Sequence, residues 1–221
     1  MQETGLIGSS RAQQAALRVR PKLDRELSEL GLLFGDPVFM RIFKQEKQLE
    51  LWVESDTGKF VLFRSYPICA YSGGPGPKLR QGDKQAPEGF YSVAAGQLNP
   101  NSRYHLAFDL GYPNTYDRLH GRTGDFLMVH GNCVSVGCYA MGDAGIEEIY
   151  SMAAAALEGG QRAIEVHAFP FRLDAERIEA WRNAPWFEFW MELKPAYDLF
   201  EQTRVPPEIG VRGRHYSIGK T

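Results

Sequence analysis

The sequence predicts an α+β fold in which one β-rich domain is preceded by a helix and followed by further helices. Between residues 38 and 130, short segments rich in β-branched and aromatic residues alternate with clusters of turn residues, which is typical of strands. Residues 13–30 and 186–200 instead carry apolar residues at helical spacing. We therefore expect an N-terminal helical segment at 1–33, a β-rich domain at 34–170, and a helical extension at 171–221 packed on that domain.

Composition excludes several classes of protein. The 221 residues are 43% hydrophobic and 12% aromatic, which is enough for one sizeable core. The formal net charge of −2 provides no field that would attract nucleic acid. The sequence contains no run of 18 apolar residues, so it predicts no membrane-spanning helix. Residues 1–20 lack the basic start and the apolar core of a secretory signal.

The first half of the chain predicts a helix and several strands. The helix at 13–30 ends at Gly31, and strands at 38–43 and 49–53 flank a polar turn as a hairpin. A third strand is expected at 59–65. Residues 72–89 are rich in Gly and Pro and predict a long loop, either functional or a mobile linker. Further strands are expected at 90–94, 105–110 and 125–130, with polar loops at 99–104 and 111–124.

The second half predicts mainly helices. Asp143 is expected to cap a helix that runs to Gly159, and a strand at 163–169 makes His167 a structural residue. Asp174 is expected to cap a helix that ends near residue 182. A second helix begins at Pro185 and carries the aromatic stripe, and Pro195 is expected to kink or split it.

The segment from Leu127 to Met141 reads LMVHGNCVSVGCYAM and carries the candidate chemistry. A thiol is a strong nucleophile only as the thiolate, so a catalytic cysteine needs a base and backbone donors nearby. His130 at the end of a strand is the candidate base for Cys138, and Gly137 allows the N–H groups of Gly137 and Cys138 to form an oxyanion hole. The alternative is that Cys133, Cys138 and His130 are ordinary packed side chains.

This pattern resembles the active-site signature of the L,D-transpeptidase (YkuD-type) family. His130 and Gly131 are followed after a short spacer by Ser135, Val136, Gly137 and Cys138. The short spacer, together with Val136 and Ala140 where the family usually has His and Arg, is typical of the YafK-like branch. Further matching segments include PICAYSGGPGPKLRQGDKQAPEGFY, NPNSRYH, YDRLHGRTG and KPAYDLFEQTR.

The resemblance implies a fold, a site and a compartment. Mixed sheets in a sandwich or barrel are expected, with the Gly131 carbonyl orienting His130. Candidate substrate-binding residues are Ser135, Tyr104, Arg122, His120 and Tyr139. An exported, periplasmic protein is implied, so we expect the natural chain to be longer at its N-terminus. In that oxidising compartment Cys69 and Cys133 are the candidate disulfide pair, the alternative being three reduced thiols.

The implied function is cysteine-dependent acyl transfer on peptidoglycan stem peptides without a cofactor. The YafK-like branch favours hydrolysis of the amide between meso-diaminopimelate and the C-terminal lysine of the outer-membrane (Braun) lipoprotein. The alternative in the same class is an L,D-transpeptidase that forms diaminopimelate crosslinks or attaches the lipoprotein. In another class, His130, Cys133 and Cys138 could bind zinc with one further ligand, or the domain could be an inactive peptidoglycan-binding module.

Overall fold

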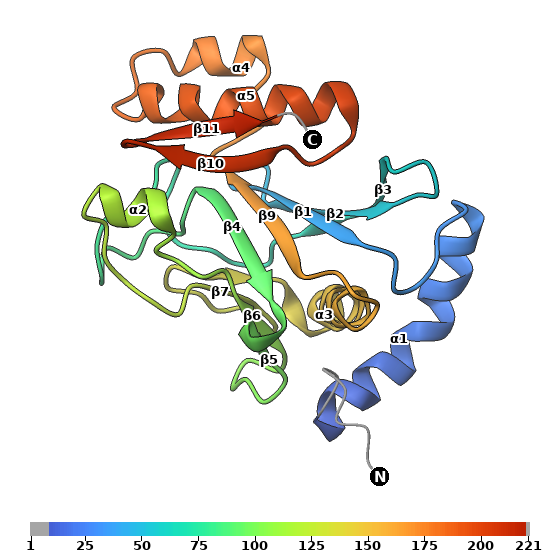
Figure 1. Cartoon of the computed structure of the whole chain (residues 1–221). Coiled ribbons are helices and arrows are strands. Elements are labelled where there is room, and N and C mark those ends of the chain that lie inside the picture. Colours follow the sequence, from blue (N-terminus) through green and yellow to red (C-terminus); the bar gives the residue numbers. More distant parts are fainter. Residues whose placement is uncertain (1–8, 220–221) are drawn as a thin grey trace.

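The computed structural model describes residues 9–219; residues 1–8, which begin the segment considered for a signal sequence, and residues 220–221 lie outside it. The elements follow the chain as drawn in Figure 1. In order they are α1 (Ser10–Glu29), β1 (Val38–Phe43), β2 (Gln48–Glu54), β3 (Phe60–Pro67), β4 (Gly89–Ala94), η1 (Ala95–Gln97), β5 (Leu98–Asn99), β6 (Ala107–Asp109), α2 (Thr115–Leu119), β7 (Met128–His130), β8 (Tyr139–Ala140), α3 (Gly142–Glu158), β9 (Ala163–Phe169), α4 (Ala175–Ala180), α5 (Phe187–Thr203), β10 (Glu208–Arg212) and β11 (His215–Gly219).

A five-stranded sheet with the order β3-β2-β1-β9-β4 forms the middle layer. The predicted hairpin is present, because β1 and β2 pair antiparallel from Val38–Val53 to Phe43–Gln48, whereas β1 and β9 are parallel. All six residues of β1 are buried. Met40 and Ile42 belong to one apolar cluster, while Phe39 and Phe43 belong to clusters formed with the C-terminal helices. Alternate residues of a strand face opposite sides, so both faces of this sheet are covered.

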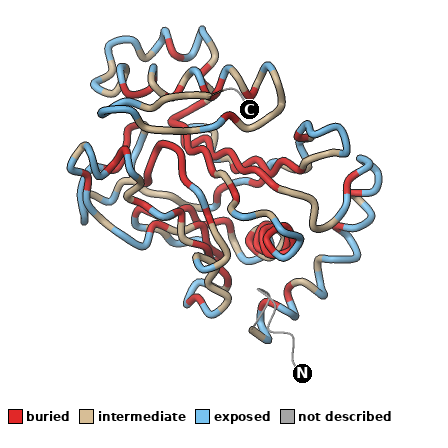
Figure 2. The backbone as a smooth tube through the Cα atoms, in the orientation of Figure 1, coloured by how far each residue is buried: buried red, intermediate tan, exposed pale blue. Residues whose placement is uncertain are grey.

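One side of the sheet is covered by α3 and by a four-stranded sheet with the order β5-β6-β7-β8. Figure 2 shows α3 end-on with most of its turns coloured as buried, and residues 149–157 are all buried. Helix α1 packs against α3. Asp143 does not cap α3: the N-cap is Met141, and the Asp143 carboxylate accepts a hydrogen bond from the Asn132 N–H. The carboxylate therefore ties the first turn of α3 to the loop that follows β7.

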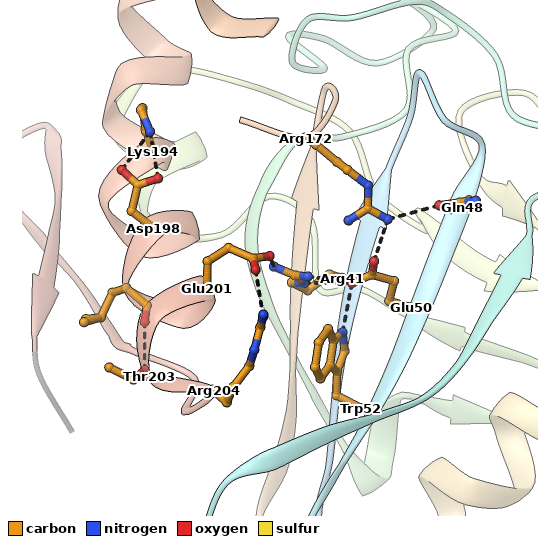
Figure 3. Close-up of polar contacts among 11 residues, drawn as sticks. Arg41, Gln48, Glu50, Trp52, Arg172, Lys194, Asp198, Glu201, Thr203 and Arg204 are labelled. Carbon is orange, nitrogen blue, oxygen red and sulfur yellow. Dashed lines mark hydrogen bonds and ion pairs between the residues drawn. The ribbon is translucent and has the colours of Figure 1, made fainter. Parts of the chain in front are cut away.

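The other side of the sheet is covered by α4, α5 and the β10–β11 hairpin, which lie together at the top of Figure 1. Asp174 caps α4 as predicted, whereas α5 begins at Phe187 and continues through Pro195 without splitting. Figure 3 shows the Arg41 guanidinium of β1 between Glu50 of β2 and Glu201 of α5. The C-terminal extension is only partly helical, because residues 208–219 form a β-hairpin that the sequence did not predict.

The sheets form separate layers and do not close into a barrel among the described residues. The strands beside the long loops are shorter than expected: β6 and β7 have three residues each. Within residues 9–219, no helix combines the length and apolar character that crossing a membrane requires.

Candidate active site

His130 ends β7 and is almost fully buried. Its Nδ1 lies 2.6 Å from the Gly131 carbonyl oxygen. Because a carbonyl oxygen can only accept a hydrogen bond, Nδ1 carries the hydrogen, and Nε2 of the neutral ring has a free lone pair. Burial lowers the pKa of His130 and outweighs the opposing effect of the Gly131 hydrogen bond. The Gly131 carbonyl thus has the geometry expected of a group that orients a general base.

Cys138 immediately precedes β8 and is a free, partly buried cysteine. Its Sγ lies 3.5 Å from the Met128 N–H, which donates to it, and 3.6 Å from the Phe126 carbonyl, to which the thiol donates. Burial raises the pKa of Cys138, and the nearby Asp109 carboxylate acts in the same direction. A neutral thiol satisfies both backbone contacts, because it can accept from one group and donate to the other.

The β-ladder brings the segments of the two residues together. Val129 pairs with Tyr139 and His130 with Ala140 in parallel register. Cys138 immediately precedes β8, and the contact of its sulfur with the Met128 N–H places it beside the start of β7. His130 ends the same three-residue strand, so both residues belong to one short stretch of the sheet.

The loop between β7 and β8 is held by side-chain and backbone contacts. Gly137 has a φ of 94°, a conformation that favours glycine, and its N–H donates to the Ser72 hydroxyl at 2.7 Å. Ser135 donates to the Cys138 carbonyl at 2.6 Å. The predicted oxyanion donor at Gly137 therefore already has an acceptor. Ser135 supports from within the loop at residues 131–138, which is the candidate nucleophile loop.

Several exposed apolar side chains lie close to Cys138 or His130, or in the loop between β7 and β8. The Tyr104 ring lies 4.8 Å from the His130 ring and is 40% exposed. Phe126, whose carbonyl contacts Cys138, is 67% exposed, and Val134 and Val136 of the nucleophile loop are also exposed. Exposed apolar groups gathered at one place favour contact with a ligand, so Tyr104 is well placed among the candidate binding residues.

Three other candidate binding residues make contacts away from Cys138 and His130. Arg122 is buried, forms an ion pair with Asp117 and lies over the Phe189 ring. His120, at the end of α2, stacks on Tyr116. The Tyr139 side chain is fully buried, and its hydroxyl donates to the Pro87 carbonyl at 2.6 Å. These contacts support the fold around the site, and Tyr139 has no exposed surface for a substrate.

A disulfide joins Cys69 and Cys133, whose Cα atoms are 5.3 Å apart. It links the segment after β3 to the nucleophile loop and leaves Cys138 as the free thiol among the described residues. An oxidised Cys133 is unable to act as a thiolate ligand, so the zinc set of His130, Cys133 and Cys138 is not formed in this state. Residues 9–219 also contain no cluster of three or more His, Cys, Asp or Glu side chains suited to a metal ion.

The long loop at residues 72–89 is ordered by buried charges. Lys44 has no exposed side-chain surface; its Nζ contacts Glu88 at 3.0 Å and donates to the carbonyls of Gly76 and Ala86. Glu88 also accepts from the Gly76 N–H and from Trp190 of α5. The loop is therefore an anchored wall beside the site, and the alternative of a mobile linker is wrong.

Three residues that contact Cys138 or Gly137 were not predicted from the sequence: Ser72, Phe126 and Met128. Phe126 and Met128 act through backbone groups, which carry no side-chain signal. Ser72 lies 65 positions before Gly137, within a loop whose composition favours serine for turns alone. The antiparallel bridge between Ala70 and Ala140 brings the two segments together.

Comparison with known proteins finds close relatives of this chain. YafK of Escherichia coli K12, which carries the provisional name L,D-transpeptidase, is 48% identical over 188 residues, covering 85% of this chain and 76% of YafK. The same values hold for YafK of Escherichia coli O157:H7. No protein-family model matches the chain.

A solved structure supports the fold. The K307A mutant of Pgp2, a helical cell shape determining protein from Campylobacter jejuni, superposes with a TM-score of 0.51 at 22% identity. The similarity covers 81% of this chain and 63% of the Pgp2 chain, so this chain spans less than two thirds of that protein.

Proposed function

This chain belongs to the L,D-transpeptidase family, and we propose that it uses Cys138 and His130 for cysteine-dependent acyl transfer on peptidoglycan stem peptides. The observation that carries the proposal is the bond between His130 Nδ1 and the Gly131 carbonyl. It leaves Nε2 free to act as a base, and the pairing of β7 with β8 brings the segment of His130 next to that of Cys138.

The reaction follows from these groups. His130 Nε2 takes the thiol proton as Sγ attacks a peptide carbonyl, and backbone N–H groups bind the oxyanion that forms. When the tetrahedral intermediate collapses, the C–N bond breaks and the imidazolium returns the proton to the leaving amine. The acyl group is then a thioester on Cys138. Attack by water completes hydrolysis, whereas attack by an amine completes transpeptidation.

We infer that water is the acceptor and that the enzyme cuts the amide between meso-diaminopimelate and the C-terminal lysine of an outer-membrane lipoprotein. This preference rests on the match of the segment from Val129 to Met141 to the YafK-like branch. A periplasmic location follows from the same substrate, because peptidoglycan lies outside the inner membrane. The rival reaction at the same site is the formation of diaminopimelate crosslinks.

The test is incubation of the protein with lipoprotein-linked muropeptides, followed by mass spectrometry. Hydrolysis releases the lipoprotein peptide with the gain of one water, and transpeptidation yields a new crosslinked dimer. Cys138→Ala removes the nucleophile and is expected to abolish both products. Because this side chain makes only weak sulfur contacts, we expect the variant to remain folded. Turnover by folded Cys138→Ala would show that the nucleophile assignment is wrong.

A further inference from the structure

Ser72 lies beside the loop that carries Cys138. Ala70 and Ala140 form an antiparallel bridge, in which the Ala140 N–H donates to the Ala70 carbonyl at 2.9 Å and the Ala70 N–H donates back to the Ala140 carbonyl. Ser72 follows this bridge by two residues, and its hydroxyl contacts the N–H of Gly137, the residue immediately before Cys138. The disulfide at Cys69 fixes the same segment one residue before this bridge.

The Ser72 hydroxyl makes two hydrogen bonds with different partners. It accepts from the Gly137 N–H at 2.7 Å and donates to the Lys84 carbonyl at 2.7 Å. Its only proton is therefore engaged on Lys84, which leaves an oxygen lone pair directed at Gly137. The peptide between Val136 and Gly137 is held in one orientation immediately before the nucleophile.

Gly137 leaves little freedom for this peptide to shift. A Cβ atom added at Gly137 would lie 3.2 Å from Leu127 Cδ1 and 3.5 Å from the Gln85 carbonyl, so the backbone is closely packed on both sides. Its positive φ reverses the chain between Val136 and Cys138. The direction of the Cys138 N–H is set by this turn, and oxyanion stabilisation depends on donors held within a few tenths of an ångström.

We propose that Ser72 is a positioning residue for the oxyanion site: by holding the Gly137 N–H, it fixes the turn that aims the Cys138 N–H at the carbonyl oxygen of an acyl donor. This inference rests on the proposed acyl-transfer chemistry. The hydroxyl is only one of several contacts that hold the 72–89 loop. The 72–89 loop is anchored independently by Lys44 and Glu88, and the Ser72 backbone carbonyl accepts from the Ala86 N–H.

Two small reagents separate oxyanion stabilisation from thiol reactivity. p-Nitrophenyl acetate acylates Cys138 through a tetrahedral oxyanion: the C–S bond forms, p-nitrophenolate leaves, and the thiol proton passes to His130. Iodoacetamide alkylates the same sulfur by displacing iodide, and no oxyanion forms. We expect Ser72→Ala to slow acylation by about 10- to 100-fold while the alkylation rate stays within about twofold of wild type. Ser72→Thr, which keeps the hydroxyl, is expected to restore most of the acylation rate.

A matched control is Thr123→Val. The Thr123 hydroxyl accepts from the Gln81 N–H at 3.2 Å, so this variant removes a hydroxyl contact from the same loop without touching Gly137. It is expected to react with both reagents as wild type does. Cys138→Ala provides the blank for each reagent.

Two results would overturn the proposal: unchanged or faster acylation of Ser72→Ala, or an equal loss of acylation and alkylation. Neither result would change the conclusion drawn from the muropeptide assay about the proposed function. Conversely, failure to cleave any muropeptide would refute the proposed substrate, while the ratio of the two reagent rates would still report on Ser72.

Discussion

Burial gives Cys138 and His130 opposite pKa shifts that favour the same neutral state. The pKa of the thiol rises and the pKa of the imidazole falls, because burial disfavours the charged form of each group. At neutral pH the structure therefore favours a thiol beside a free base over a thiolate–imidazolium pair. Proton transfer then accompanies attack on the substrate, and the resting thiol is a poor target for oxidants.

The pH dependence of activity follows from these directions. As pH rises through the pKa of His130, the ring loses its proton and becomes a competent base, so kcat/KM is expected to rise with a midpoint below the ordinary histidine value of 6.5. The thiolate absorbance of wild type minus Cys138→Ala is expected to appear only above the ordinary thiol pKa of 9.0. A full thiolate signal at neutral pH would contradict the neutral pair.

Substitution of the base is expected to reduce turnover without unfolding the protein. His130→Asn removes the proton acceptor at Nε2 and should lower kcat by about 10²- to 10⁴-fold. The matched control is His120→Asn, because His120 stacks on Tyr116 and its Nδ1 contacts the Tyr116 carbonyl. We expect near-normal activity from that variant in the muropeptide assay. If His120→Asn were inactive and His130→Asn active, His120 rather than His130 would be the general base.

At the scale of elements, the disulfide joins two segments that form the walls of the site. Cys69 and Cys133 are 64 positions apart, and closing a loop of that length stabilises the fold by about 4 kcal/mol in the chain-entropy model. We expect alkylation of the unreduced, unfolded protein to label Cys138 alone. Reduction, or the double substitution Cys69→Ala with Cys133→Ala, should lower the free energy of unfolding in urea. Three labelled thiols without reductant would exclude the disulfide.

The 72–89 loop depends on a buried ion pair. Glu88→Gln would leave the Lys44 ammonium without its counter-charge in a site with no exposed surface, and breaking such a pair costs about 3–5 kcal/mol. Asp198→Asn is the control, because the Lys194–Asp198 pair in Figure 3 lies at the surface of α5, where a pair is worth at most about 1 kcal/mol. Denaturant titration of both variants measures the difference. Equal stability losses would contradict the anchoring role.

The sequence predicts local features well and long-range contacts poorly. Hydrophobic periodicity places α1, the β1–β2 hairpin, α3 and β9, because each pattern is set by which residues face the core. The β10–β11 hairpin escapes this reasoning, since its residues are mostly half-buried and alternate only weakly. Pro195 does not split α5, because packing of the helix on the sheet outweighs the lost hydrogen bond.

The residues of the candidate site show the same difference between local patterns, which the sequence predicts, and long-range contacts, which it does not. His130, Gly131 and Cys138 lie in one short segment whose spacing indicates chemistry, so they are accessible to sequence reasoning. Arg122 and His120 have suitable chemistry on a neighbouring loop, yet their partners are Asp117 and Tyr116. Ser72 contacts the site only because a strand-like pairing joins distant segments. Partners set by tertiary pairing leave no local pattern.

At the scale of the whole molecule, the layers meet at aromatic clusters around the central sheet. His167 of β9 is fully buried between Phe39 and Phe90, with ring centroids 4.8 and 4.6 Å away, and neither ring nitrogen has a hydrogen-bond partner. Burial, followed by the charge of Arg41, lowers the pKa of His167 to about 3. The predicted structural role of His167 thus takes a specific form: a neutral ring packs among aromatic side chains of β1 and β4.

This ring makes the fold sensitive to acid. Below the ordinary histidine pKa of 6.5, the unfolded chain binds a proton at His167, whereas the folded protein does not until pH reaches about 3. Folding stability therefore falls as pH drops through this window, by about 1.4 kcal/mol per pH unit from this residue. His167→Phe and His167→Leu remove the titrating group, so we expect a shallower loss of stability between these limits than in wild type. The measurement is urea unfolding at a series of pH values.

The control is His215→Gln, which alters a side chain that is 76% exposed. It is expected to keep the wild-type slope of unfolding free energy against pH. If both His167 variants kept that slope as well, the acid sensitivity would have to arise from the carboxylates at the surface and between the layers.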